Sequence, residues 1–259
     1  PLKAIRAKKE ASIIGCMQLL KEKKVEAVFS AGSTGATLIS AITILGKQKG
    51  VIRPAIASVL PTSKGSVILL DSGASLDVKP KVLYQYAVMG SKLAEVLLDL
   101  NSPRVGLLNN GEEESKGRDL EKSAYKLLNS SNLNFIGNVE GRDFATEIVD
   151  VFVTDGFTGN VVLKTLEGTA RLQQKLISDS LRKNLFKPLL PLVKKAFEPV
   201  KDKLDPDKTN ASYLLGVDGL VTIGHGSSKQ EAIKNGIKYT SNSVQKDFIG
   251  KFSETLNEL

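Results

Sequence analysis

The 259-residue sequence has no tryptophan, one cysteine and one histidine, and aromatic residues make up only 5% of it. The single cysteine, Cys16, excludes a disulfide within the chain and is typical of a reducing compartment. One cysteine and one histidine (His225) are too few for a Cys/His zinc site within one chain. No apolar run approaches the roughly 18 residues that a membrane-spanning helix needs.

Charge is unevenly distributed. The net charge is +8, and the segment 171–204 alone carries +6. Its nine basic residues, opposed by Asp179, Glu198 and Asp202, are Arg171, Lys175, Arg182, Lys183, Lys187, Lys194, Lys195, Lys201 and Lys203. Such a patch indicates an acidic protein surface, an anionic membrane or nucleic acid as partner. Nucleic acid is disfavoured, because aromatic residues are few and no recognition-helix pattern occurs.

Apolar residues interleave with the lysines of the same segment, as in Leu185-Phe-Lys-Pro-Leu-Leu190. This amphipathic cationic pattern suits a helix lying on anionic lipid. A solvated helix that packs at a dimer interface has the same pattern, so both interpretations stay open.

Short apolar runs alternate with stretches of helical period. The expected strands are Val25–Ser30, Pro54–Leu60, Ser66–Leu70, Arg104–Leu108, Phe135–Gly137, Val149–Thr154 and Leu220–Ile223. The expected helices are Leu2–Lys24, Thr37–Leu45, Val82–Leu98, Leu120–Leu128, Asn160–Ser180 and Lys229–Leu259. Continuous apolar strands between helices are typical of a mostly parallel sheet covered on both faces. We therefore expect one α/β domain over residues 1–259, with three α/β/α layers and a protruding helical segment at 171–210.

Three polar, glycine-containing turns each follow a strand and open a helix: Ala31–Ala36, Asp155–Asn160 and Gly224–Ser228. Each turn either caps its helix or surrounds an anion with N–H groups and hydroxyls at the helix N-terminus. Because open α/β sheets bind ligands at strand ends, their recurrence favours a shared anion site. The residues assigned to it are Gly32, Ser33, Thr34, Gly35, Asp71, Asn109, Gly111, Asp155, Gly156, Thr158, Gly159, Asn160, Gly226 and Ser227.

Two further residues are catalytic candidates. The acidic loop Asn109–Gly117 either is solvated or carries Lys116 into the strand-end cleft as an electrophile. His225 stands between two glycines, where it either donates to backbone or acts beside the anion. Nucleotide fingerprints fail, because Gly224-His-Gly226 lacks the third glycine of G-x-G-x-x-G and Gly46-Lys47 lacks the flanking residues of a P-loop.

Several motifs together resemble one family. They are Ser30-Ala-Gly-Ser-Thr-Gly-Ala36, Leu70-Asp-Ser-Gly-Ala74, Val105-Gly-Leu-Leu-Asn109, Val153-Thr-Asp-Gly-Phe-Thr-Gly-Asn160, Lys164-Thr-Leu-Glu-Gly168 and His225-Gly-Ser-Ser228. Their order resembles the PlsX family, the acyl-[acyl-carrier-protein]:phosphate acyltransferases of bacterial phospholipid synthesis. The resemblance implies a Rossmann-like fold, related to isopropylmalate dehydrogenases and phosphotransacetylases, in a homodimer.

The reaction that the resemblance implies joins inorganic phosphate to the acyl group of an acyl-carrier-protein thioester, giving acyl phosphate and free carrier protein. It implies no metal or organic cofactor, and it makes the lysine matching Lys116 catalytic. It also implies a cytoplasmic protein at the inner face of the membrane, beside the glycerol-3-phosphate acyltransferase that uses its product. The alternatives are a phosphotransacetylase-like acyltransferase, an isopropylmalate-dehydrogenase-like oxidoreductase, and a membrane- or nucleic-acid-binding module without catalysis.

The chain departs from the family pattern at three places. Family members begin with a strand carrying Asp-Ala-Met-Gly-Gly-Asp, so we expect an N-terminal segment, and part of the site, to lie upstream of Pro1. Thr209-Asn-Ala211 stands near the usual Gly-Gly, and Ser72 stands where a small apolar residue is common.

Overall fold

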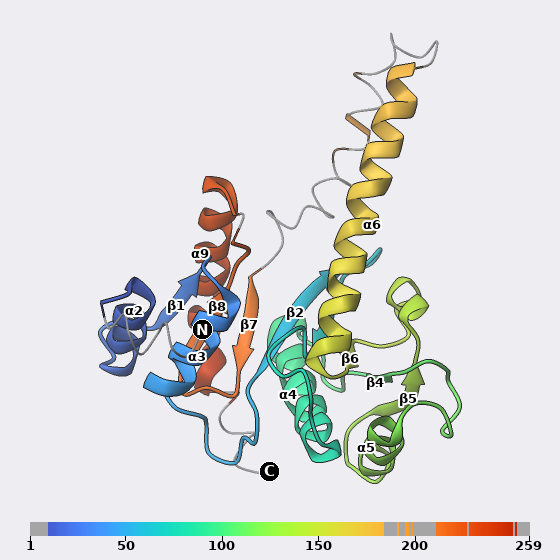
Figure 1. The fold of residues 1–259 in the computed structure, drawn as a ribbon, viewed down its shortest axis with the longest axis horizontal. Coiled ribbons are helices and arrows are strands. Elements are labelled where there is room, and N and C mark those ends of the chain that lie inside the picture. The colour runs from blue at the N-terminus through green and yellow to red at the C-terminus, as the bar shows by residue number, and fades with distance from the viewer. Residues whose placement is uncertain are drawn as a thin grey trace.

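The computed structural model describes residues 10–183, 191, 195–196, 198, 211–226, 228–250 and 252. Figure 1 shows helices packed on both faces of one sheet. Its eight strands are β1 (Ala27–Ser30), β2 (Ala55–Pro61), β3 (Ser66–Leu70), β4 (Val105–Leu108), β5 (Phe135–Val139), β6 (Val151–Val153), β7 (Ser212–Leu215) and β8 (Leu220–Ile223). The helices are α2 (Ser12–Lys21), α3 (Thr34–Ile44), α4 (Pro80–Leu98), α5 (Asp119–Asn129), the 3₁₀ helix η1 (Gly141–Ala145), α6 (Gly156–Lys183) and α9 (Gln230–Gln245).

The strands lie in the order β1-β8-β7-β2-β3-β6-β4-β5. Four of the seven neighbouring pairs are parallel, β1 with β8, β3 with β6, and β4 with both β5 and β6. The antiparallel pairs are β2 with β3, β2 with β7, and β7 with β8. The expected three-layer α/β fold with a mostly parallel sheet is confirmed.

The two outer parts of the sheet run in opposite directions, which the sequence interpretation did not foresee. The connection between β2 and β3 is only Thr62–Gly65, and a parallel pair needs a crossover of a dozen or more residues. The strands are nevertheless offset along one another, so that the ends of β8 and β3 lie at the same level across the sheet. Ile223, the last residue of β8, pairs with Ser212, while Ser58 of β2 pairs with Leu69 near the end of β3.

Side chains alternate between the two faces of the sheet. On one face, Leu70, Val153 and Tyr213 join the core formed with α4. On the other face, Ile56 and Leu214 pack with Met17 of α2 and Ala41 of α3. The latter face also receives the start of α6, because Val162 and Leu163 pack against the cluster of Leu69 and Phe152. It therefore carries α2, α3 and the first turns of α6.

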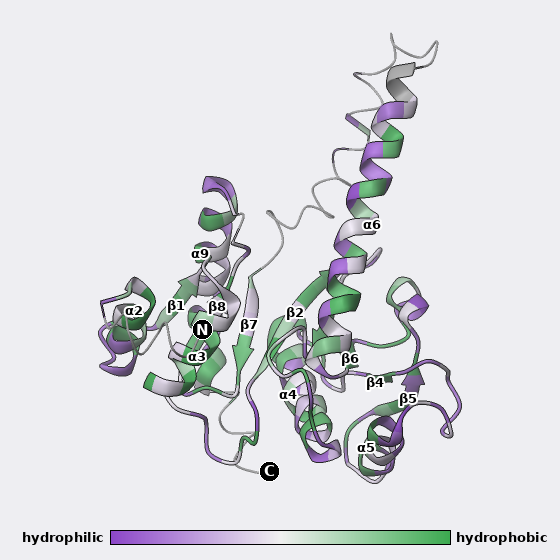
Figure 2. Ribbon diagram, in the orientation of Figure 1, coloured by the Kyte–Doolittle hydropathy of each residue, from purple (hydrophilic) through white to green (hydrophobic). Residues whose placement is uncertain are grey.

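Helix α6 continues far beyond the sheet, and Figure 1 shows it rising clear of the other elements. Among its residues up to Ser180, only Gly156 and Gly159 are buried. Exposed apolar residues recur along it, and Figure 2 shows hydrophobic and hydrophilic turns alternating there. The exposed apolar residues of α6 are Phe157, Val161, Leu166, Leu172, Leu176 and Ile177. None of the described helices is long and apolar enough to cross a membrane.

Some expected elements need correction. The sequence does not predict β7, because its residues stand at the end of a proline-containing stretch that has no clear period. The expected final helix is interrupted: α9 ends at Gln245, Asp247 adopts a left-handed φ of 51°, and residues 248–250 and 252 are helical again. Residues 251 and 253–259 lie outside the described ones. Of the expected first helix, Ser12–Lys21 is helical, and residues 1–9 lie outside the described ones. Most of the basic segment after Lys183 also lies outside them.

Candidate active site

A cavity of about 390 Å³ opens on the α3/α6 face at the middle of the sheet. It brings together the three glycine turns that the sequence grouped, through Thr34, Asn160 and Gly226. The cavity is lined by Thr34, Ile56, Ser58, Ser72, Gly73, Leu76, Asn160, Leu163, Lys164, Glu167, Ser212, Ile223, Gly224, His225 and Gly226. Ligand sites of α/β sheets lie at such meeting points of strand ends.

A charged cluster forms one wall of this cavity. Glu167 Oε1 lies 3.0 Å from both Lys164 Nζ and His225 Nε2. Lys164 and Glu167 stand three residues apart on α6, so their side chains share one face, and His225 reaches them from the turn after β8. Burial raises the pKa of Glu167, but His225 and Lys164 outweigh it and hold the pKa at about 2. The cluster therefore holds an ionised carboxylate between two cationic or donor groups.

Sequence interpretation named His225 but gave Lys164 and Glu167 no role. The two residues belong to the Lys164-Thr-Leu-Glu-Gly168 motif, which was the available signal. A lysine and a glutamate at this spacing on a helix are usually a solvated surface pair. Only the tertiary contact with His225, 58 residues away, distinguishes them.

Asp71 organises the turn below the cavity instead of lining it. Its carboxylate is 0% exposed and accepts hydrogen bonds from the backbone amides of Ile56, Gly73, Ala74 and Ser75 at 2.8–3.1 Å. Burial raises the pKa of Asp71, and these amides oppose the rise. Since its oxygens are occupied and covered, we assign Asp71 to ordering this turn and not to the phosphate-binding role that the sequence predicts for it.

The turn Asp155–Asn160 is an N-terminal cap of α6. Asp155 is 2% exposed, and it accepts from the Thr158 amide at 2.8 Å and the Thr158 hydroxyl at 2.9 Å. Gly156 donates its amide to the Ser75 carbonyl at 2.9 Å. These groups satisfy each other, so the capping alternative holds for Asp155, Gly156 and Thr158. Asn160, one helical turn further, is the residue of this turn that lines the cavity.

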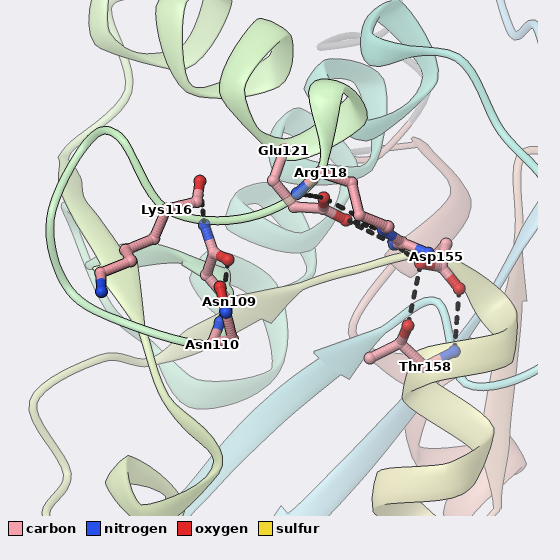
Figure 3. Close-up of polar contacts among 7 residues, drawn as sticks. All are labelled: Asn109, Asn110, Lys116, Arg118, Glu121, Asp155 and Thr158. Carbon is pink, nitrogen blue, oxygen red and sulfur yellow. Dashed lines mark hydrogen bonds and ion pairs between the residues drawn. The ribbon is translucent and has the colours of Figure 1, made fainter.

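Arg118 links this cap to the loop before α5, as Figure 3 shows. Its Nη2 donates to Asp155 Oδ2 at 2.6 Å and also to Glu121. Burial raises the pKa of Asp155, but the Thr158 amide and Arg118 together bring it below its usual value. The carboxylate is therefore ionised and fixed at the start of α6.

Lys116 lies in that same loop and is not among the residues that line the cavity. Asn109 Nδ2 donates to the Lys116 carbonyl at 3.2 Å, and the stem of Lys116 passes over Gly111, where a Cβ would meet its Cγ at 2.8 Å. The ammonium lies 3.9 Å from Glu113, and Figure 3 shows it directed away from Asp155. Asn109 and Gly111 thus shape the loop that presents Lys116.

The first glycine turn is mainly a cap as well. Ser33 accepts from the Ala36 amide at 3.5 Å, and the Gly32 amide donates to Ser30 Oγ at 3.3 Å. Thr34 alone of Gly32–Gly35 lines the cavity. In the third turn, Gly226 lines it, and Ser227 lies outside the described residues. Among the described residues, no group of three or more His, Cys, Asp or Glu could hold a metal ion.

Solved structures of two proteins, a phosphotransacetylase and a branched-chain phosphotransacylase, share this fold. A phosphotransacetylase from Streptococcus pyogenes superposes with a TM-score of 0.59 at 16% identity, over 95% of this chain and 71% of that one. A branched-chain phosphotransacylase from Enterococcus faecalis gives 0.55 at 12% identity, over 90% and 78%. At these identities the similarity defines the fold class only.

Sequence similarity is more specific. Residues 1–251 match the family described as fatty acid synthesis protein. The phosphate acyltransferase of Elusimicrobium minutum is 43% identical over 259 residues, covering 100% of this chain and 76% of that protein. That of Halothermothrix orenii is 44% identical over 261 residues, covering 100% and 78%. The chain belongs to this family, the PlsX phosphate acyltransferases, and is an acyltransferase.

Proposed function

We propose that this protein transfers an acyl group from the thioester of acyl-carrier protein to inorganic phosphate, in the cavity between α3 and α6. The observation that carries the proposal is the convergence of Thr34, Asn160 and Gly226, from three separate turns, on a cavity that also contains Lys164 and His225. Hydroxyl, amide and cationic groups around one hollow are suited to a tetrahedral dianion.

Phosphate is nucleophilic without prior activation by a serine or cysteine. One of its oxygens attacks the thioester carbonyl carbon, and a C–O bond forms as the carbonyl oxygen takes negative charge. Collapse of this intermediate breaks the C–S bond, leaving acyl phosphate and a thiolate that takes up one proton. The chain has to hold two reactants in line and stabilise the oxyanion.

We assign Lys164 to binding the negative charge of phosphate in the cavity, and His225 to orienting phosphate or supplying a proton. Lys164 side-chain exposure is 49%, so its ammonium can reach an incoming anion while Glu167 orients it. Glu167 holds the His225 ring, with Oε1 3.0 Å from Nε2, and we assign His225 to orient phosphate or supply the proton of the departing thiol. Lys116 stays a proposed electrophile that acts from its loop on the developing oxyanion.

The decisive experiment follows thiol release from acyl-carrier protein with and without phosphate, with acyl-coenzyme A as a parallel donor. We expect release to require phosphate, acyl phosphate to accumulate in equal amount, and the carrier-protein thioester to be the better donor. Release that is independent of phosphate would contradict the proposal. Equal or better use of acyl-coenzyme A would instead favour a phosphotransacetylase-like activity.

We also propose a homodimer in which α6 is covered by a second copy. Phe157, Val161, Leu172 and Leu176 repeat at spacings of 4, 11 and 4 residues, which returns to one face of a helix. This stripe is apolar and exposed. Leu172→Ser combined with Leu176→Ser should lower the mass measured by light scattering from dimer to monomer; an unchanged mass would remove α6 from the interface.

Half of the basic segment 171–204 lies outside the described residues. We assign the segment two partners, the acidic carrier protein and an anionic membrane. Either suits an enzyme at the inner face of the membrane that passes acyl phosphate to a glycerol-3-phosphate acyltransferase in phospholipid synthesis. Co-sedimentation with vesicles of increasing anionic lipid content tests the membrane partner. Binding that ignores the lipid charge would contradict it.

A further inference from the structure

Three serine hydroxyls form a continuous hydrogen-bonded chain in a second part of the cavity wall. Ser58 Oγ lies 2.8 Å from Ser72 Oγ and 3.0 Å from Ser212 Oγ. They come from β2, the turn after β3, and the start of β7, and all three line the cavity that Lys164 and His225 also line. Ser58 and Ser72 are only 4% and 6% exposed, so bulk water cannot easily replace these contacts.

Proton counting gives this chain two arrangements. In the inward arrangement, Ser72 Oγ donates to the Ile56 carbonyl at 3.1 Å, Ser58 donates to Ser72, and Ser212 donates to Ser58. Ser212 then offers only lone pairs to a ligand. In the outward arrangement, Ser72 donates to Ser58, Ser58 donates to Ser212, and the Ser212 proton is free for a ligand.

The inward arrangement has three hydrogen bonds and the outward arrangement has two, so a ligand that accepts from Ser212 is needed to complete the outward one. A backbone contact keeps the cost of turning outward small. The Ile56 carbonyl also accepts the Ser72 amide at 2.8 Å, so it keeps a partner when the Ser72 hydroxyl turns away. Neither arrangement leaves a buried donor or acceptor of the chain without a partner, which would cost about 1–3 kcal/mol. Ser212 can therefore either accept a hydrogen bond from a ligand or donate one to it.

We infer that this serine chain is the phosphate-selective part of the site, with Ser58 as its positioning residue; the inference rests on the proposed function. Near neutral pH, inorganic phosphate carries one or two protons, and each P–OH group needs an acceptor. In the inward arrangement Ser212 accepts a hydrogen bond from such a P–OH group. In the outward arrangement Ser212 donates one to an unprotonated phosphate oxygen. Sulfate has the same shape but no proton, so it uses only the outward chain. A site that pairs a ligand proton discriminates against an analogue without it.

The test is direct binding of inorganic phosphate and of sulfate, measured by calorimetry at neutral pH and constant ionic strength. We expect the wild type to prefer phosphate, and Ser58→Ala to lose about tenfold in phosphate affinity and much less in sulfate affinity. The matched control is Ser40→Ala, because Ser40 is 0% exposed and its hydroxyl has no hydrogen-bond partner in the described structure. Ser212→Ala, at the cavity end, should resemble Ser58→Ala.

The outcomes separate this inference from the proposed function. A phosphate-to-sulfate ratio that is unchanged in Ser58→Ala and Ser212→Ala overturns the serine chain and leaves a phosphate site standing. A lowered ratio in a protein without phosphate-dependent thiol release supports the chain and contradicts the acyl transfer. A wild type that does not bind phosphate, or binds sulfate equally well, overturns the inference.

Discussion

Arg118 Nη2 donates to Asp155 Oδ2 at 2.6 Å, and this bond joins the loop of Lys116 to the first turn of α6. The partners differ sharply in environment, since 62% of the Arg118 side chain is exposed and only 2% of the Asp155 side chain is. The ion pair thus compensates a buried charge from the surface. It connects the two parts of the chain to which we assign cationic groups, Lys116 and Lys164.

Removal of this pair should destabilise the protein. Arg118→Ala leaves the buried Asp155 carboxylate with only its Thr158 bonds, and we expect a loss of about 1–2 kcal/mol in the free energy of unfolding at pH 7. Because the folded pKa of Asp155 is lowered, the pair's contribution is present above the ordinary pKa of 3.8 and is lost as pH falls below it. Urea titrations at pH 7 and near pH 3 should show the deficit shrinking.

The control for Arg118 is Arg142→Ala. Arg142 is also largely exposed, but its partners Glu112 and Glu140 are more accessible than Asp155. Such a pair contributes little, and we expect Arg142→Ala to lower the free energy of unfolding much less than Arg118→Ala does. Equal effects of the two substitutions would show that the burial of Asp155 does not matter.

Glu167→Gln should change how stability depends on pH. The folded pKa of Glu167 is about 2, against 4.5 ordinarily, so its contribution is complete above about pH 4.5 and is lost as pH falls towards 2. The wild type should therefore lose more stability than Glu167→Gln across this window. Chemical unfolding at pH 7, 4.5 and 3 measures the difference, and parallel curves would mean that Glu167 does not pair with Lys164 and His225 in solution.

Lys164→Ala should weaken the use of phosphate. We expect the KM for phosphate to rise about tenfold or more, because a cation in direct contact with a dianion is lost. Lys175→Ala is the control: it removes the same charge from the same helix three turns further on, about 16 Å away. Similar KM values for the two variants would indicate a general charge effect and not a contact in the cavity.

Gly159→Ala should be strongly destabilising. A Cβ at Gly159 would lie 1.9 Å from the Asp71 carbonyl oxygen, so α6 would have to move off the turn that it packs on. We expect a loss of about 2 kcal/mol or more in unfolding free energy. Gly168→Ala, on the same helix with nothing within 4 Å of the new methyl, should stabilise by up to about 1 kcal/mol. Thermal unfolding of both variants measures these changes. A Gly159→Ala variant as stable as the wild type would contradict the close packing of α6 on this turn.

The sequence alone determined the alternation of strands and helices, because apolar period and glycine turns are local signals. It also grouped Thr34, Asn160 and Gly226, since similar turns after strands have similar surroundings in an α/β sheet. The family followed from motifs spread over the chain. The sequence did not predict β7. Its four residues lie between β8 and β2, and pairing with these two strands fixes their extended conformation, which their own sequence pattern does not indicate.

Tertiary structure decided which of the polar turn residues face a ligand. The sequence assigns Asp71 and Asp155 to the anion site. In the structure each carboxylate instead orders a turn, because buried charges must be paired or hydrogen-bonded. The tertiary arrangement of α6, β2, β7 and β8 places five further residues in the cavity wall, namely Lys164, Glu167, Ser58, Ser72 and Ser212. Their chemistry depends on contacts between residues up to 154 positions apart, as between Ser58 and Ser212, and no local pattern encodes such a contact.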